Sequence, residues 1–266
     1  MYENVRPLSR TIHETAIVHP GARLAPDVVV GPYSIIGPDV EIGPHTEIGP
    51  HVLIDGWTKI GGYNKIYAGA CIGAEPQDLK FRGEKSYLTI GDYNIIREYV
   101  TISRGTEGGG GETRIGSHNL FMAYTHVAHD CQVGNYVVMA NSAALAGHVV
   151  VEDRVVIGGL VGVHQFCKLG RMAMIGAHSM VVKDVPPYVM VDGNPAHVYG
   201  INVVGLRRNN VPPEIRAEIK KAYRILYRSN LNVAQAIEQM EQELASSPEI
   251  DHFIRFLRSA DRGICR

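Results

Sequence analysis

The chain has 266 residues, 45% of them hydrophobic, and its formal net charge is −1 at pH 7. This near-neutral charge gives no reason to expect a nucleic-acid partner. No apolar run is long enough to span a membrane, and the start lacks a basic-then-apolar secretion signal, so we expect a cytoplasmic protein. The four cysteines form no CxxC pair, which fits reduced thiols.

An aliphatic residue recurs at every sixth position from Val18 to Ile72, through ten hexads that follow one another without a gap. A fixed short period of this kind is typical of a parallel β-helix, in which each hexad forms one face and three hexads form one triangular coil. The aliphatic side chains should face the axis. We expect the glycine that usually follows each of them to adopt the corner dihedrals that other residues resist.

The period continues beyond two interruptions. Ile90, Ile96 and Ile102 keep the original phase, and twelve further hexads run one residue out of phase from Ile115 to Val181. Together these hexads predict an all-β prism of about eight coils over residues 1–200.

The two interruptions lie near residues 75–88 and 103–114. A solenoid tolerates loops at its corners, and such loops commonly line binding sites. The first loop carries Gln77, Asp78 and Lys80, a polar cluster suited to a ligand's hydroxyls and charges. In the second loop, we expect Gly108 to Gly111 to form a flexible spacer.

From about Pro195 the period disappears, and the pattern predicts three amphipathic helices that begin near Pro212, Asn232 and Ser247. We expect residues 201–266 to form a C-terminal α-helical domain that covers the end of the prism. Basic residues crowd its first part: Arg207, Arg208, Arg216, Lys220, Lys221, Arg224 and Arg228. Such a run is often only a solvated helix face, but it also favours an acidic partner or a phosphate.

Histidines gather in the later coils. Because one coil is 18 residues, Gly147 and Gln165 should lie in the same column as His129. We expect His129 to act as a general base, Asp130 to orient its ring, and the Gly147 N–H to stabilise an oxyanion. His148 and His164 flank this column, and His126 lies across one corner.

Two chemistries fit this cluster. No serine or cysteine nucleophile is evident in the column, which favours direct attack by a substrate hydroxyl on an acyl donor. A zinc site is the rival, with His126 and His129 as a possible ligand pair. The carboxylate beside His129 and the glycine above it favour base catalysis.

Several segments resemble one family. The hexads, QDLK at residues 77–80, RGT at 104–106, HVAHDC at 126–131, LAGHV at 145–149, VHQFC at 163–167 and DVPPYV at 184–189 are similar to bacterial UDP-N-acetylglucosamine O-acyltransferases. The resemblance covers nearly the whole chain. It implies a left-handed parallel β-helix and a homotrimer with active sites between neighbouring prisms. It also implies transfer of a 3-hydroxyacyl chain from acyl carrier protein to the sugar 3-hydroxyl, in lipid A biosynthesis, with neither cofactor nor metal.

The resemblance also assigns roles to single residues. His129 matches the catalytic base, Asp130 its orienting carboxylate and Gly147 the oxyanion amide. The positions that match substrate contacts are Gln77, Asp78, Lys80, His126, His148, His164, Gln165, Asn202 and Arg208. Ala177 matches the residue that measures acyl length, and a side chain larger than glycine there favours a medium chain.

Three departures from the family pattern, at Pro195, Val204 and Asn209, leave open a 3-amino analogue of the sugar as acceptor.

An N-acyltransferase of the same superfamily carries a large N-terminal uridine-binding domain, for which hexads that begin by residue 15 leave no room. From another class, a zinc-dependent hydratase similar to the γ-type carbonic anhydrases is the alternative.

Overall fold

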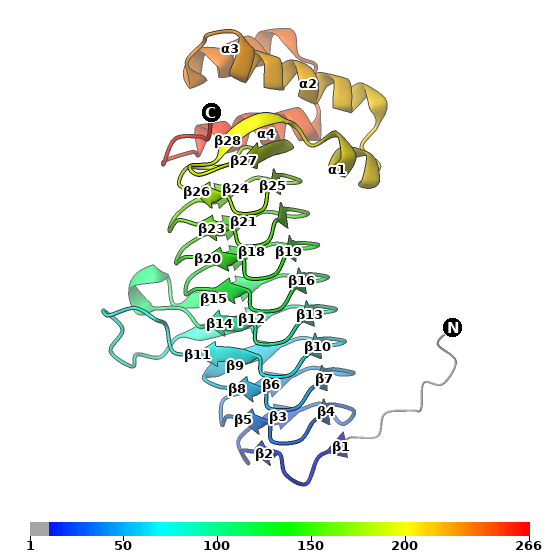
Figure 1. The fold of residues 1–266 in the computed structure, drawn as a ribbon, viewed down its shortest axis with the longest axis vertical. Coiled ribbons are helices and arrows are strands. Elements are labelled where there is room, and N and C mark those ends of the chain that lie inside the picture. The colour runs from blue at the N-terminus through cyan, green and yellow to red at the C-terminus, as the bar shows by residue number, and fades with distance from the viewer. Residues whose placement is uncertain (1–10) are drawn as a thin grey trace.

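The computed structural model describes residues 11–266, which form a tall three-sided prism with helices at one end (Figure 1). The first sheet contains β1 (Thr11–Ile12), β4 (Val29–Val30), β7 (Glu47–Ile48), β10 (Lys65–Ile66), β13 (Ile95–Ile96), β16 (Leu120–Phe121), β19 (Val138–Met139), β22 (Val156–Ile157), β25 (Met174–Ile175), β27 (Val189–Asp192) and β28 (His197–Ile201). The second contains β2 (Ile17–Val18), β5 (Ile35–Ile36), β8 (Leu53–Ile54), β11 (Cys71–Ala74), β14 (Thr101–Ser103), β17 (His126–Val127), β20 (Ala144–Leu145), β23 (Gly162–Val163) and β26 (Met180–Val181). The third contains β3 (Arg23–Leu24), β6 (Glu41–Ile42), β9 (Trp57–Ile60), β12 (Tyr87–Ile90), β15 (Glu112–Ile115), β18 (Gln132–Val133), β21 (Val150–Val151) and β24 (Lys168–Leu169).

Strands of successive coils pair in parallel, with equivalent residues in register. Val127 pairs with Leu145 and Leu145 with Val163, and all three are buried. The aliphatic residue of each hexad therefore points to the axis, as the period predicts, and identical positions stack to form one continuous core. The structure adds one strand, β1, before the first hexad of the sequence pattern, while residues 1–10 of the expected prism lie outside the described residues.

The expected role of the glycines was wrong. The left-handed corner residue stands three positions after the aliphatic one and is usually not glycine; Tyr93, His118 and Tyr136 have φ near +60° there. The glycine directly after the aliphatic residue serves close stacking instead. A Cβ on Gly31 or Gly43 would lie 2.6–2.7 Å from backbone atoms of the next coil. At these two positions the local backbone therefore leaves no room for a side chain.

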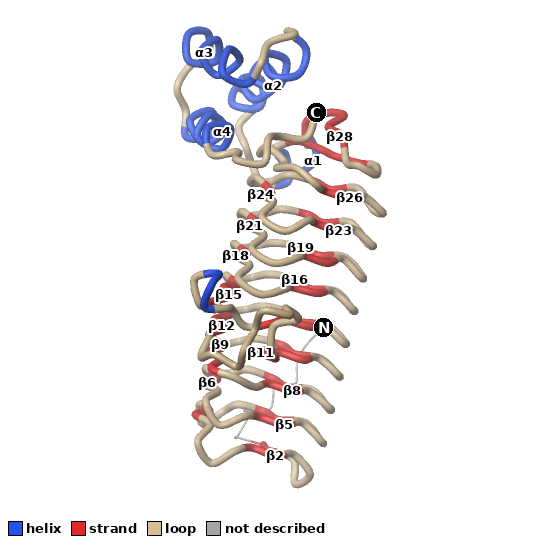
Figure 2. The backbone as a smooth tube through the Cα atoms, turned by 90° about the vertical axis from the view of Figure 1, so that its left-hand side faces the viewer, coloured by secondary structure: helices blue, strands red, loops and turns tan. Residues whose placement is uncertain are grey.

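Both interruptions emerge at the same corner, between the second and third sheets. Loop 1, residues 75–86, joins β11 to β12, and loop 2, residues 104–111, joins β14 to β15. They project side by side from one edge of the prism (Figures 1 and 2). In loop 2, Glu107–Gly109 form a 3-10 helix, η1, whose Gly109 lies against Asp130, while the flexibility expected of Gly108 to Gly111 stays a prediction.

The C-terminal part begins with a hairpin, in which β27 pairs in parallel with β25 and antiparallel with β28. Four helices follow rather than the three expected: α1 (Val203–Arg208), α2 (Pro213–Arg228), α3 (Val233–Glu243) and α4 (Pro248–Arg258). The extra helix, α1, is too short to show an amphipathic period. The expected helix starts near Asn232 and Ser247 are confirmed, since Asn232 forms a capping box with Gln235 and Ser247 accepts a hydrogen bond from the Ile250 N–H.

The helices cover the C-terminal end of the prism (Figure 2). They have a core of their own around Leu226, Met240 and Phe253. The chain then returns to the prism, where the Cys265 N–H donates to the Asp184 carbonyl at 2.8 Å. The division into domains at 1–200 and 201–266 stays a prediction. Within residues 11–266 no helix combines the length and apolar character needed to cross a membrane.

Candidate active site

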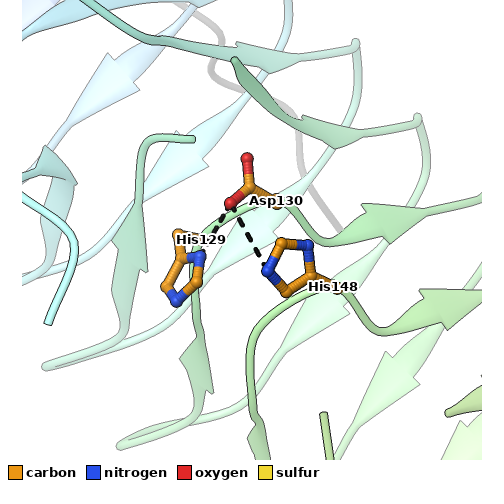
Figure 3. Close-up of side chains that lie close together, drawn as sticks. All are labelled: His129, Asp130 and His148. Carbon is orange, nitrogen blue, oxygen red and sulfur yellow. Dashed lines mark hydrogen bonds and ion pairs between the residues drawn. The ribbon is translucent and has the colours of Figure 1, made fainter. Parts of the chain in front are cut away.

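His129 and Asp130 stand at the corner that follows β17, one coil above loop 2. The His129 Nδ1 lies 2.7 Å from the Asp130 Oδ2 (Figure 3). Asp130 occupies the left-handed corner position with φ +60°, a conformation that aspartate adopts more readily than most residues. Its side chain is fully buried, whereas 14% of the His129 side chain is exposed. The corner turn therefore places the buried carboxylate within hydrogen-bond distance of the His129 ring.

Loop 2 supplies the other partners of this carboxylate. The Thr106 N–H donates to Asp130 Oδ1 at 2.9 Å, and the Thr106 hydroxyl donates to Oδ2 at 2.6 Å. A Cβ on Gly109 would lie 2.0 Å from the same carboxylate, so η1 closes directly over it. The sequence predicts no role for Thr106. Only the RGT segment at residues 104–106, which is part of the family resemblance, indicated that this position is of interest. Its contacts satisfy a buried charge that would otherwise be costly.

His148 lies on the other side of Asp130. Its Nε2 is 3.9 Å from Asp130 Oδ2, too far for a hydrogen bond (Figure 3). Its ring stacks on Phe166 with centroids 4.3 Å apart. Burial lowers the pKa of His148, although the Asp130 carboxylate opposes this. We therefore expect a neutral imidazole at pH 7, able to donate or accept a hydrogen bond.

Gly147 lies in the His129 column, as the 18-residue repeat predicts. A Cβ on Gly147 would be 2.7 Å from Cε1 and 2.9 Å from Nε2 of His129. No side chain larger than a hydrogen atom fits between this backbone and the imidazole. Gly147 is buried, and its N–H donates to no acceptor among residues 11–266. The arrangement places a proton acceptor and a free amide side by side.

A cavity of about 760 Å³ opens next to these residues, a volume typical of small-molecule sites. Its wall combines both loops with the prism: Asp78, Lys80, Phe81, Arg82, Gly83, Glu84, Thr106, Glu107, Gly108, Gly109, His148 and Phe166. His129 does not line it directly, but the centroid of its ring is 5.2 Å from that of His148, which does.

Arg104, also missed by sequence reasoning, ties the two loops together. It is buried, its Nη1 donates to the Gly73 carbonyl at 3.1 Å, and its guanidinium lies 5.2 Å from the Phe81 ring centroid. The loops therefore form one wall of the cavity.

The other histidines of the expected cluster point elsewhere. His126 Nδ1 lies 2.7 Å from the Thr101 Oγ1, and burial, followed by the neighbouring His129, lowers its pKa. His164 is exposed, with Nδ1 3.1 Å from the Gln165 carbonyl oxygen, and Gln165 is exposed as well. Only His129 and His148 of the four flank the Asp130 carboxylate. In one prism His126, His164 and Gln165 do not line the cavity.

The remaining predicted residues are spread more widely. Gln77 is exposed in loop 1, outside the cavity wall formed by Asp78 and Lys80. Asn202 caps α1: its side chain accepts from the Gly205 N–H at 2.9 Å and donates to the Met172 carbonyl at 2.8 Å. Arg208 ends α1 and is exposed. Ala177 lies at a different corner, between the first and second sheets.

The positions of these side chains can be compared with the ligand set that a zinc ion would need. His129, Asp130 and His148 offer atoms within 4.8 Å of one another, but His126 is not in this group. The Asp130 Oδ2 that would bind an ion already faces the Thr106 hydroxyl and His129 Nδ1 at hydrogen-bond distance. The cluster as arranged fits an oriented base better than a ligand set.

Comparison with known proteins shows the family of the chain. Residues 184–265 match the family model described as UDP N-acetylglucosamine O-acyltransferase, domain 2, and residues 11–44 match that of the bacterial transferase hexapeptide. A Thiobacillus denitrificans protein named acyl-[acyl-carrier-protein]–UDP-N-acetylglucosamine O-acyltransferase is 52% identical over 96% of this chain and 99% of its own length. The chain belongs to the UDP-N-acetylglucosamine O-acyltransferase family.

Solved structures of this family superimpose closely on the chain. LpxA from Acinetobacter baumannii has a TM-score of 0.94 at 46% identity, over 96% of this chain and 99% of that one. The acyltransferase from Arabidopsis has a TM-score of 0.87 at 36% identity, over 96% of this chain and all of that one. The expected left-handed parallel β-helix with C-terminal helices is thereby confirmed.

Proposed function

We propose that this chain transfers a 3-hydroxyacyl group from acyl carrier protein to the 3-hydroxyl of UDP-N-acetylglucosamine, a reaction of lipid A biosynthesis, in the cytoplasm. The supporting observation is the pairing of His129 with a buried carboxylate beside the free Gly147 amide, next to a cavity of nucleotide-sugar size. The names of relatives at about 52% identity point to the same substrates.

The mechanism follows from the two ring nitrogens. His129 Nδ1–H donates to Asp130, which leaves Nε2 as the proton acceptor. Nε2 takes the proton of the sugar hydroxyl as its oxygen forms a bond to the thioester carbonyl carbon. The Gly147 N–H stabilises the resulting oxyanion. When the carbon–sulfur bond breaks, the imidazolium returns its proton to the departing thiolate. This route needs neither cofactor nor metal.

The cavity supports the assignment of the sugar nucleotide. Asp78 can accept hydrogen bonds from sugar hydroxyls, and Lys80 and Arg82 bring positive charge to the same wall for a diphosphate. His148 and Phe166 close the inner side. We propose that His126, His164 and Gln165 make the remaining contacts on the outer surface of the prism.

We also propose a homotrimer, which is supported by the unequal faces of the prism. The second sheet exposes Ile17, Ile35 and Met180, and the corner between it and the first sheet exposes Tyr33, Tyr99, Tyr124 and Leu160. The third sheet presents Arg23, Lys59 and Arg114, with Tyr87 as an exposed hydrophobic residue among them. Exposed apolar side chains gathered on one side of a protein favour an interaction surface there. A ring of three that buries the first and second sheets leaves the charged sheet in water.

Such a trimer gives the acyl chain a path. Between His129 and Ala177 lies the outer surface of the second sheet, where Ala144 and Gly162 stack in register with His126. A Cβ on Gly162 would meet nothing within 4 Å, so this strip is open. We propose that the acyl chain lies along it, covered by the neighbouring prism, with Ala177 at its end.

Arg208 provides a test of the donor assignment. It belongs to the basic cluster at the start of the helices, which suits an acidic carrier protein. We expect Arg208→Ala to raise the apparent KM for acyl carrier protein about five- to tenfold and to lower kcat less, with a smaller effect at high salt. Arg23→Ala, at the opposite end of the prism, is the matched control. Equal donor KM values in the two variants would remove Arg208 from the site.

One assay tests the proposed function. Purified protein is given acyl carrier protein thioesters of several lengths with UDP-N-acetylglucosamine or its 3-amino analogue, and the acylated sugar is quantified. We expect transfer from a 3-hydroxyacyl thioester of medium length to the hydroxyl sugar, unchanged by a chelator. Faster transfer to the amine would reassign the acceptor. Absence of transfer together with chelator-sensitive hydration of CO₂ would support the zinc-dependent hydratase instead.

A further inference from the structure

Two histidines, His129 and His148, flank the Asp130 carboxylate in this site. Contacts from the surrounding residues determine which of the two rings the carboxylate orients. Asp130 Oδ2 is 2.7 Å from His129 Nδ1 and 3.9 Å from His148 Nε2. The same carboxylate oxygen thus faces both rings and bonds to only one of them. The base of the proposed reaction therefore depends on what holds Asp130 in its present orientation.

Thr106 provides that restraint with two donors. Its N–H fixes Oδ1 at 2.9 Å, and its hydroxyl fixes Oδ2 at 2.6 Å. An ionised carboxylate only accepts hydrogen bonds, so the Thr106 hydroxyl must donate to it. Thr106 is itself buried, and its carbonyl accepts from the Gly109 and Gly111 N–H groups at 3.0 and 2.8 Å. The turn of loop 2 thus holds both donors rigidly against Asp130.

We propose that Thr106 is a positioning residue, which directs Asp130 to His129 rather than His148 and so selects His129 as the base. The catalytic part of this inference rests on the proposed function. Its structural part concerns only the tautomer of His129. With Oδ2 held, His129 carries its proton on Nδ1 and presents an unprotonated Nε2. Without the Thr106 hydroxyl, His148 can form the hydrogen bond to Asp130 in place of His129. His129 then populates both of its neutral tautomers.

The test compares Thr106→Val, which removes only the hydroxyl, with Thr106→Ser, which retains it. We expect kcat to fall about 10- to 100-fold in Thr106→Val, the effect of one lost hydrogen bond to a charged group, with KM for the nucleotide sugar changed less than threefold. Thr106→Ser should restore most of kcat. Thr46→Val is the matched control, because Thr46 is another buried threonine whose hydroxyl bonds within the prism. Its kcat should be unchanged.

A second measurement needs no turnover. In histidine-labelled protein, ¹⁵N NMR reports the tautomer of each ring. We expect a single Nδ1–H tautomer for His129 in the parent and in Thr106→Ser, and a mixture in Thr106→Val. If Thr106→Val does not fold, Thr106→Cys, whose thiol is a weaker donor of similar volume, takes its place. An unchanged tautomer in the folded variant overturns the proposal, as does a loss of kcat that serine fails to restore. An inactive parent protein would instead refute the proposed function, and the NMR result would still decide the role of Thr106.

Discussion

Replacing His129 with alanine is expected to lower kcat by about 10³-fold or more, within the range that general-base catalysis contributes. The variant loses the only unprotonated nitrogen that we place beside the free Gly147 amide. KM for the nucleotide sugar should change little, because the cavity is lined by other residues. Steady-state kinetics with both substrates measures the two constants separately.

His19→Ala is the control for this variant, since His19 is exposed in the first coils, far along the chain from the site. Both proteins should show the same thermal unfolding and the same oligomer, about three times the 29.1 kDa chain mass. Turnover in His129→Ala close to that of the parent protein would remove His129 as the base. Activity retained there but lost in His148→Ala would reassign the base to the second histidine.

The second large effect is expected from Gly147→Ala. The new Cβ would lie 2.7 Å from the His129 ring, nearer than side chains approach one another, so the ring must move. We expect kcat to fall about 10²- to 10³-fold, because the base is displaced and the amide that faces the oxyanion is partly covered. Crystallography of the variant should show a rotated His129.

Gly200→Ala tests whether an added methyl group is harmful by itself. Gly200 lies in β28, and a Cβ there would meet nothing within 4 Å. This variant should keep the activity of the parent protein. If Gly147→Ala is fully active with His129 in its present position, the amide is not where the thioester oxygen binds, and the oxyanion must be stabilised by another donor.

The six-residue repeat predicted most of the fold and part of the candidate site. An 18-residue coil places Gly147 above His129 by counting alone, and adjacent residues such as His129 and Asp130 must share a corner. The contact between Thr106 and Asp130 could not be counted in this way, since it depends on the path of an irregular loop. The same reason hid Arg104, whose side chain connects two loops.

The corner glycines show a different limit of sequence reasoning. Their frequency after each aliphatic residue suggested a conformational role, yet residues such as Tyr93 and His118 adopt the left-handed conformation instead. Composition alone cannot separate a need for positive φ from a need for close backbone stacking, because both favour glycine. Likewise, α1 has only six residues, too few for a helical period to emerge.

Asp130, His148 and Phe166 occupy the same corner position in three successive coils, with φ values of +60°, +63° and +65°. At another corner this position holds Tyr93, His118 and Tyr136, stacked 4.8–4.9 Å apart. The candidate catalytic groups thus occupy a corner position whose backbone geometry the chain repeats many times at places where we assign no catalytic role. A lineage of such prisms could acquire, lose or relocate an activity through side-chain changes at its vertices, while the framework that supports them is inherited intact.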